Sequence, residues 1–290
     1  MSIERSQTKG DTQFFNGNHF ESSGDVLSAL LGDEFDVTDT LKLIIPDAKP
    51  RDGDKDRCGG FVCLQEATMS EEQPHALVYC LMHSQTKRLA SKYIDFEFAG
   101  SPCVAEVKAI YEWEDGFIGE VSFDNEDWPY PANCLVVDYY RHENKIQIGQ
   151  KISIELSAVA FSAQKVQPKE FTIDKGPAFE MFRKEFLDEN PDKTEKDFKA
   201  PLVSTKGAVI VFPDQDNTFY KCVLPILELS ETVMLGQPIY QIKTIFIREA
   251  VDVQEDVMVT LYVPKRIVKD SLSVGDDLNC YLRLYAKVKV

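Results

Sequence analysis

The segment IGQKISIELSAVA at residues 148–160 recurs without a gap as VGDDLNCYLRLYA at residues 274–286. Glycine, leucine and alanine occupy the same three places in both copies, and apolar residues alternate in step between them. Alternation with a period of two indicates a β-strand with one buried face. Each copy ends a stretch of short strand patterns, so the sequence predicts a duplicated small β domain.

The two predicted repeats span residues 101–166 and 201–290. Both contain short apolar runs at near-regular spacing, separated by turn signals such as Asp115-Gly116, without interleaved helical patterns. This arrangement predicts a mainly β, β-rich α+β chain with tandem small β-barrel or sandwich repeats. A five-stranded unit that ends in a Gly-led strand pair resembles the oligonucleotide/oligosaccharide-binding fold, although small SH3-like barrels give a similar pattern. The resemblance covers about half of the chain and implies single-stranded nucleic acid or another protein as ligand.

The rest of the chain is predicted to be more heterogeneous. Residues 167–200 read as a helical linker, because Phe179, Phe182 and Phe186 share one helical face. Three phenylalanines favour burial, so we expect this helix to plug or bridge the repeats; an element presented to a partner is the alternative. Residues 21–100 are predicted to form a mixed α/β module. Residues 1–20 are polar, lack the features of a signal peptide and suggest a mobile arm.

Composition limits the classes of partner. The net charge is −16, which disfavours nucleic acid as the default ligand and favours a basic protein partner. No apolar run approaches the ~20 residues that cross a bilayer, so we expect no membrane partner and a cytoplasmic location. The seven cysteines are an odd number and lie mostly in apolar patterns, which predicts reduced, buried thiols.

The most unusual local segment runs from Tyr111 to Tyr130. It holds seven carboxylates and both tryptophans, with no lysine or arginine between Lys108 and Arg141. One interpretation is a β core with a solvated acidic face; the functional one is an acidic rim around aromatic anchors that binds a basic protein. The candidate partner-binding residues are Tyr111, Glu112, Trp113, Glu114, Asp115, Asp124, Glu126, Asp127 and Trp128.

Metal sites and catalysis have weaker support. Cys58, Cys63, Cys80 and His83 could hold zinc, but four residues rather than two separate the first two cysteines, which favours buried thiols. A cation site at residues 124–127 lacks the glycine and terminal glutamate of a calcium-binding loop. No phosphate-binding, dinucleotide-binding, hydrolase or metalloprotease motif occurs. We therefore expect a non-enzymatic protein without cofactors.

Basic residues gather near the end of the chain. They are Lys265, Arg266, Lys269, Arg283, Lys287 and Lys289, and they suggest either a protected edge strand or a nucleic-acid groove. The leading hypothesis is a protein-interaction module of the adaptor, inhibitor or immunity type that binds a basic partner. The alternatives are a single-stranded nucleic-acid-binding protein with tandem repeats, and an inhibitor that mimics DNA.

Overall fold

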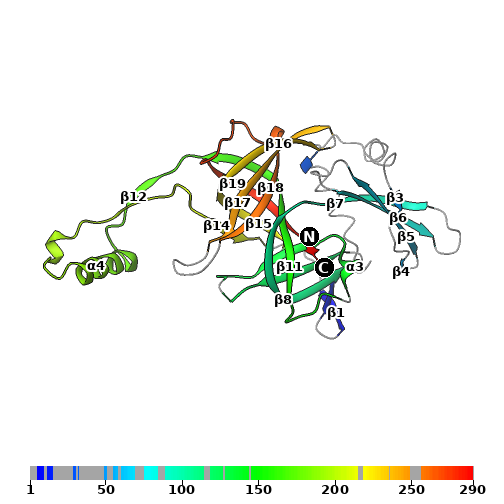
Figure 1. Cartoon of the computed structure of the whole chain (residues 1–290), viewed down its shortest axis with the longest axis horizontal. Helices are drawn as coiled ribbons and strands as arrows, with labels where there is room; N and C mark the ends of the chain where they lie inside the picture. Colours follow the sequence, from blue (N-terminus) through cyan, green and yellow to red (C-terminus); the bar gives the residue numbers. More distant parts are fainter. Residues whose placement is uncertain are drawn as a thin grey trace.

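The computed structural model describes most of the chain from residue 89 onward and shorter parts before it. The described residues are 5–9, 12–15, 29–30, 32, 49–50, 55–57, 60–68, 75–83, 89–113, 118–126, 128–143, 145–214, 218–234, 236–248 and 256–289. They form a large mixed sheet, a five-stranded sheet and a two-stranded ribbon (Figure 1). The prediction of a mainly β chain is confirmed.

The large sheet contains strands from both predicted repeats. Its members are β1 (Arg5–Lys9), β2 (Thr12–Phe15), β8 (Ser101–Trp113), β9 (Gly119–Asp124), β10 (Ala132–Val136), β11 (Lys151–Val166), β14 (Ile210–Pro213), β15 (Phe219–Pro225), β16 (Glu228–Met234), β17 (Gln237–Ile247), β18 (Val257–Pro264) and β19 (Asp277–Lys289). Short helical segments precede β11 and β19: these are α3 (Tyr139–His142) and the 3₁₀ turn η3 (Lys265–Ile267). Both repeats thus follow one plan.

The two copies of the duplicated segment pair with each other. They form β11 and β19, which run antiparallel over most of their length. Ser157 lies opposite Tyr285, and Val159 lies opposite Arg283. The copies start at residues 148 and 274, an offset of 126, so these two pairs are equivalent and an approximate two-fold axis passes between β11 and β19. The repeats therefore join into one body rather than lying apart.

Matching glycine turns start both central strands. Gly149 has φ 83° and Gly275 has φ 87°, a conformation that glycine adopts without the strain caused by a Cβ atom. The Gly149 N–H donates to the Val107 carbonyl at 2.7 Å, and the Gly275 N–H donates to the Ile226 carbonyl at 2.8 Å. The identical glycines in the sequence thus mark equivalent turns.

Each repeat also gives a strand to its neighbour. β10 pairs in parallel with β19, and β18 pairs in parallel with β11. The pairings of β8, β9, β10, β19 and β11 return to β8. One continuous hydrophobic cluster takes residues from both halves, from Ala105 to Val288. Folding of either repeat therefore depends on the other.

The predicted linker helix does not plug or bridge the repeats. It is α4 (Pro177–Glu189), and none of its residues is buried. It lies at the end of an arm built on β12 (Glu170–Thr172) and β13 (Leu202–Ser204), far from the large sheet in Figure 1. Phe179 and Phe186 pack instead on Phe198, and their ring centroids lie 5.4 and 5.5 Å from the Phe198 centroid, respectively. The expectation of burial between the repeats was wrong, because one aromatic residue after the helix covers its apolar face locally.

The N-terminal part is described less fully. Its antiparallel sheet contains β3 (Lys49–Pro50), β4 (Lys55–Arg57), β5 (Gly60–Thr68), β6 (His75–His83) and β7 (Leu89–Glu97). The described helical residues of this part are Ala29 and Leu30, so the mixed α/β character of residues 21–100 stays a prediction. At the end of β7, the buried Phe96 packs on the buried Phe98, and Phe98 packs on Tyr262 and Tyr285, which anchors the chain that leads into β8.

Candidate functional site

The predicted acidic and aromatic segment is only partly at the surface. Trp128 is 7% exposed and belongs to the shared core, so it is not a surface anchor. Tyr111 and Glu112 are half-buried on β8, between β2 and β9. The residues Glu114, Asp115 and Asp127, and the side chain of Trp113, lie outside the described part. Burial of Trp128 follows from its apolar ring, which the surrounding carboxylates obscured in the sequence.

An acidic patch does exist next to this segment. Lys108 on β8 donates a hydrogen bond to Glu106 at 2.8 Å. That bond, together with the charges of Glu106, Asp124 and Glu126, raises the pKa of Lys108 above its ordinary value. Glu126 is exposed and Asp124 is half-buried, so the local potential is negative. Among the described residues, however, the patch has no exposed tryptophan beside it.

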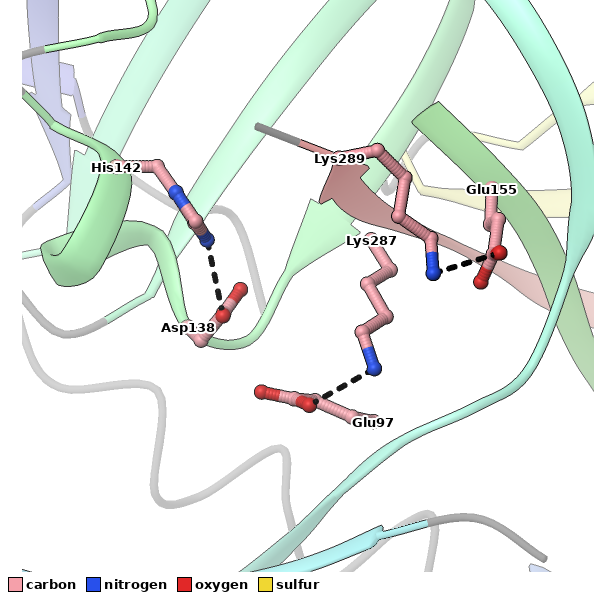
Figure 2. Close-up of polar contacts among 6 residues, drawn as sticks. All are labelled: Glu97, Asp138, His142, Glu155, Lys287 and Lys289. Carbon is pink, nitrogen blue, oxygen red and sulfur yellow. Dashed lines mark hydrogen bonds and ion pairs between the residues drawn. The ribbon is translucent and has the colours of Figure 1, made fainter. Parts of the chain in front are cut away.

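Most of the C-terminal basic residues are engaged within the protein. Lys265 forms an ion pair with Glu231, and Arg266 donates to the Ala29 carbonyl. Lys287 Nζ lies 3.3 Å from Glu97 Oε2, and Lys289 Nζ lies 2.7 Å from Glu155 Oε1. Figure 2 shows both ion pairs. They therefore do not line one open basic groove.

We call the residues around Glu155, Lys287 and Lys289 the charged side of the β11–β19 pair. Glu155 and Lys287 lie directly opposite each other in the register. The Glu97 side chain is 2% exposed, and its ion pair with Lys287 fixes the end of β7 against β19. Nearby, His142 lies 3.1 Å from Asp138 (Figure 2). The cavity lined by Glu97, Phe98 and Lys287 is only about 10 Å³, so the end of β7 covers this part of the charged side, whereas Lys289 is exposed.

Three aromatic rings meet on the other side of the two-fold axis. Phe219 on β15 stacks on Tyr281 on β19, with centroids 5.4 Å apart and ring planes at 16°. Phe161 on β11 lies 5.3 Å from Phe219 and 6.3 Å from Tyr281. All three rings are half-buried. We call this the aromatic side of the β11–β19 pair.

A β-bulge lies at Phe161 on the aromatic side. The register shifts between Ala160 and Ser162, so Phe161 is the extra residue. Ala160 and Ala163 both stay buried on either side of it. A bulge of this kind re-aims one side chain without moving the core contacts of its neighbours.

The aromatic side continues across adjacent strands as a solvent-facing surface. Tyr281 lies opposite Lys221, and Lys221 lies opposite Phe212, which is 63% exposed. Gln164 and Asn279 lie opposite each other and are both exposed. A cavity of about 550 Å³ opens here, and Phe161, Tyr281, Lys221, Lys269, Gln164 and Asn279 are among its lining residues. Exposed rings, amides and lysines thus share one surface.

The charges around this surface are mixed. Lys221 lies 3.3 Å from Asp214 and stays largely exposed, and Lys269 is exposed. Arg283 lies with its guanidinium carbon 5.0 Å from the Phe219 centroid. The carboxylate that lines the cavity among the described residues is Asp270. Aromatic rings with flanking cations can hold flat, anionic ligands.

The sequence predicts this site only in part. Arg283 and Lys269 belong to the basic residues near the end of the chain, but the sequence pattern does not bring Phe161, Phe219 and Tyr281 together. They come from three strands and meet only through the pairing of β15, β19 and β11. The available signal was Asn279-x-Tyr281-x-Arg283, a strand face with no aliphatic residue.

The other predicted chemistry gains no support. Cys63 and Cys80 lie opposite each other on β5 and β6, and Gly60 lies opposite His83, but their side chains and Cys58 lie outside the described part. No group of three or more His, Cys, Asp or Glu side chains placed to hold a metal occurs in the described residues. Cys134, Cys222 and Cys280 are buried free thiols, as predicted for reduced cysteines.

Comparisons with known proteins indicate no function, so a functional hypothesis depends on the geometry of the site. The chain matches no protein-family model, no curated protein and no solved structure. None of the helices in the described part of the chain is both long and apolar enough to span a bilayer.

Proposed function

We propose that the protein binds single-stranded nucleic acid on the aromatic side of the β11–β19 pair. The observation that carries the proposal is the meeting of Phe161, Phe219 and Tyr281 on a solvent-facing sheet beside Lys221 and Lys269. Unpaired bases offer flat faces that stack on such rings, while lysines neutralise the phosphates. Paired bases cannot stack in this way, so the proposed ligand is a single strand.

The charge distribution is compatible with this proposal. Residues 201–290 contain 10 lysines and arginines and 11 aspartates and glutamates, against 32 and 48 in the whole chain. The acid excess therefore lies almost wholly in residues 1–200. Phosphate repulsion falls off within about one Debye length, ~8 Å at physiological salt, so local charge matters more than the net charge.

The strand pairings support the barrel interpretation that underlies the proposal. The pairings of β8, β9, β10, β19 and β11 form a circuit, as a small closed barrel requires. The second half repeats the plan with β15, β17, β18 and the shared central strands. Barrels of this size that resemble the oligonucleotide-binding fold bind strands on an exposed sheet face.

The test is a titration of a labelled oligothymidylate followed by fluorescence anisotropy. A length of about 12 nucleotides lies within the ~4–16 nucleotides that such a site covers. Wild-type protein should bind at low salt, and the Phe219→Ala and Tyr281→Ala variants should bind about 10-fold more weakly, because each loses a stacking surface. Phe171→Ala is the matched control, since Phe171 is an exposed ring on the arm.

Several outcomes would contradict the proposal. These are the absence of wild-type binding at low salt, equal losses for Phe171→Ala and Tyr281→Ala, and preference for a duplex of the same length. Unfolding curves for each variant separate lost binding from lost structure. Because the three rings are only half-buried, the variants should remain folded.

A second candidate function remains the acidic interaction module. Its supporting observation is the negative patch of Glu106, Asp124 and Glu126 around Lys108, next to the predicted site of Glu112, Glu114 and Asp115. Such a surface would steer a basic protein partner into contact. Charge reversal at Asp124 and Glu126 should then slow association with that partner while leaving dissociation unchanged. An unchanged association rate would contradict this candidate.

A further inference from the structure

Arg283 is the buried cation nearest to the aromatic side. It lies in the middle of β19, opposite Phe219 on β15 and Val159 on β11, and it is only 2% exposed. Its Nε donates a hydrogen bond to Thr218 Oγ1 at 3.2 Å. The guanidinium lies over the Phe219 ring, which in turn stacks on Tyr281. Arg283 is therefore the inner end of the aromatic row.

The buried guanidinium of Arg283 has too few polar partners to offset the cost of removing its charge from water. No Asp or Glu side chain in the described part of the chain forms an ion pair with Arg283, and its Nη1 is buried without a hydrogen-bond partner there. Buried charges are normally paired, because removal from water costs several kcal/mol per ion in order of magnitude. A cation–π contact and one neutral hydrogen bond offset only part of that cost.

The fold itself does not require a cation at this position. The offset of 126 residues between the two copies makes Ser157 the equivalent of Arg283. Ser157 is 1% exposed and neutral, and its half of the molecule has the same strand plan. The charge of Arg283 therefore has a reason that is specific to the second half, where the aromatic side lies.

We propose that Arg283 and Thr218 form the phosphate subsite of the aromatic side. This inference rests on the proposed function and names the part of the ligand that this end of the site recognises. Phosphate oxygens would accept hydrogen bonds from the guanidinium and from the Thr218 hydroxyl, while a neighbouring base stacks on the Phe219–Tyr281 pair. Because Nη1 is inaccessible in the free chain, the side chains around it must move apart as the strand binds.

The experiment compares wild type, Arg283→Met and Arg141→Met in oligothymidylate binding at several salt concentrations. Arg141 is an exposed arginine on α3 and serves as the matched control. Arg283→Met should weaken binding about 10-fold, as expected for a lost charge-assisted hydrogen bond. The slope of log K against log salt should fall by about 0.7, the value for one phosphate contact with a single strand. Arg141→Met should change neither quantity.

Thermal unfolding without ligand separates the two roles of Arg283. A merely structural role predicts a lower melting temperature for Arg283→Met, whereas the phosphate subsite does not. Methionine removes an uncompensated buried charge, so the melting temperature of Arg283→Met should be equal to or higher than that of wild type. A lower melting temperature together with an unchanged salt slope would show that Arg283 only supports Phe219, and would overturn the inference. Thr218→Val should weaken binding with the salt slope unchanged, because it removes a neutral contact.

One further arm separates failure of the inference from failure of the proposed function. If wild type binds no strand, the proposed function fails, and inorganic tripolyphosphate then tests the subsite by itself. A rise in the melting temperature of wild type but not of Arg283→Met would retain an anion site at Arg283. Equal shifts, or none, would reject the subsite as well. If wild type binds the strand and Arg283→Met keeps the full salt slope, only the inference fails.

Discussion

The two sides of the β11–β19 pair have the same backbone plan and opposite chemistry. On the charged side, Glu155 lies opposite Lys287, and the ion pairs to Lys289 and Glu97 neutralise the charges within the protein. On the aromatic side, the equivalent of Glu155 is Tyr281, which packs with Phe161 and Phe219 at a cavity of about 550 Å³. The chain itself covers part of the first side, whereas a cavity opens at the second.

This difference shows how a duplicated fold can divide its tasks. The end of β7 and the residues beside it, Phe96 to Phe98, cover the part of the charged side around Lys287, so this side contributes to stability. Among the described residues, no such cover lies over the aromatic side. Its three rings are only half-buried, so they add little to stability. We infer that substitutions on the charged side will chiefly change folding, whereas those on the aromatic side will chiefly change binding.

The largest effect is expected at Gly100, which leads into β8 on the charged side. Its equivalent on the aromatic side is Phe219, because Ser101 pairs with Leu156 as Tyr220 pairs with Leu282. A Cβ atom at Gly100 would lie 2.6 Å from the Leu156 carbonyl oxygen. Gly100→Ala should lower the free energy of unfolding by about 3 kcal/mol, the upper range for overpacking, as measured by urea denaturation.

Gly149→Ala is the control for that substitution. Its Cβ atom would meet nothing within 4 Å, but the residue has a positive φ, so the expected cost is about 1 kcal/mol from backbone strain alone. Equal costs at the two glycines would show that β8 can move away from β11. The charged side would then be less rigid than its proposed role in stability implies.

A smaller effect is expected from the ion pair that closes the charged side. Lys287→Met leaves the buried Glu97 carboxylate without this partner and should lower the free energy of unfolding by about 2 kcal/mol, less than a fully buried pair because Lys287 is 28% exposed. Adding Glu97→Gln should restore about half of the loss. Additive losses in this double-mutant cycle would mean that the Glu97–Lys287 ion pair does not fix the end of β7 to β19. Binding to oligothymidylate should be unchanged throughout.

The smallest effect concerns the two glycine turns. Asp276, the equivalent of Gln150, has a pKa below its ordinary value of 3.8, first because of the hydrogen bond from Lys165 and also because of the Ser273 N–H and the lysine charge. Since the folded pKa is the lower one, this carboxylate stabilises the fold above about pH 4, and the contribution disappears as pH falls through the folded pKa. Asp276→Asn should therefore cost about 0.5 kcal/mol near neutral pH.

The pH dependence provides the check on that prediction. Urea denaturation of wild type and Asp276→Asn should give unfolding free energies that converge as the pH is lowered below 4. A difference that stays constant across this range would show that Lys165 does not stabilise the charged form of Asp276. The turn at Gly275 would then depend on its backbone hydrogen bond to Ile226 alone.

Some of this architecture could be predicted from the sequence, and the reasons are local. The period of two in both copies of the duplicated segment predicted β11 and β19, and the paired glycines predicted the turns at Gly149 and Gly275. Alternation identifies the buried face of a strand but not its partner. The antiparallel pairing of the two copies therefore could not be deduced, and neither could the exchange of β10 and β18.

The site was harder to predict than the strands. Trp128 and its neighbouring carboxylates suggested a surface anchor, but a single acidic run does not reveal which side chains are buried. Phe161, Phe219 and Tyr281 are far apart in the sequence and become neighbours through two strand pairings and one bulge. The neutralisation of Lys287 and Lys289 likewise depends on Glu97 and Glu155, which lie more than 130 residues earlier in the chain.

The most direct test of the central claim is photo-crosslinking of a single strand that carries photoreactive bases, followed by peptide mapping. We expect crosslinks at Phe161, Phe219 or Tyr281 and none at Glu155, Lys287 or Lys289. Competition by unlabelled single strand should abolish them. Crosslinks on the charged side, or an even distribution over both sides, would contradict the claim that only the aromatic side binds nucleic acid.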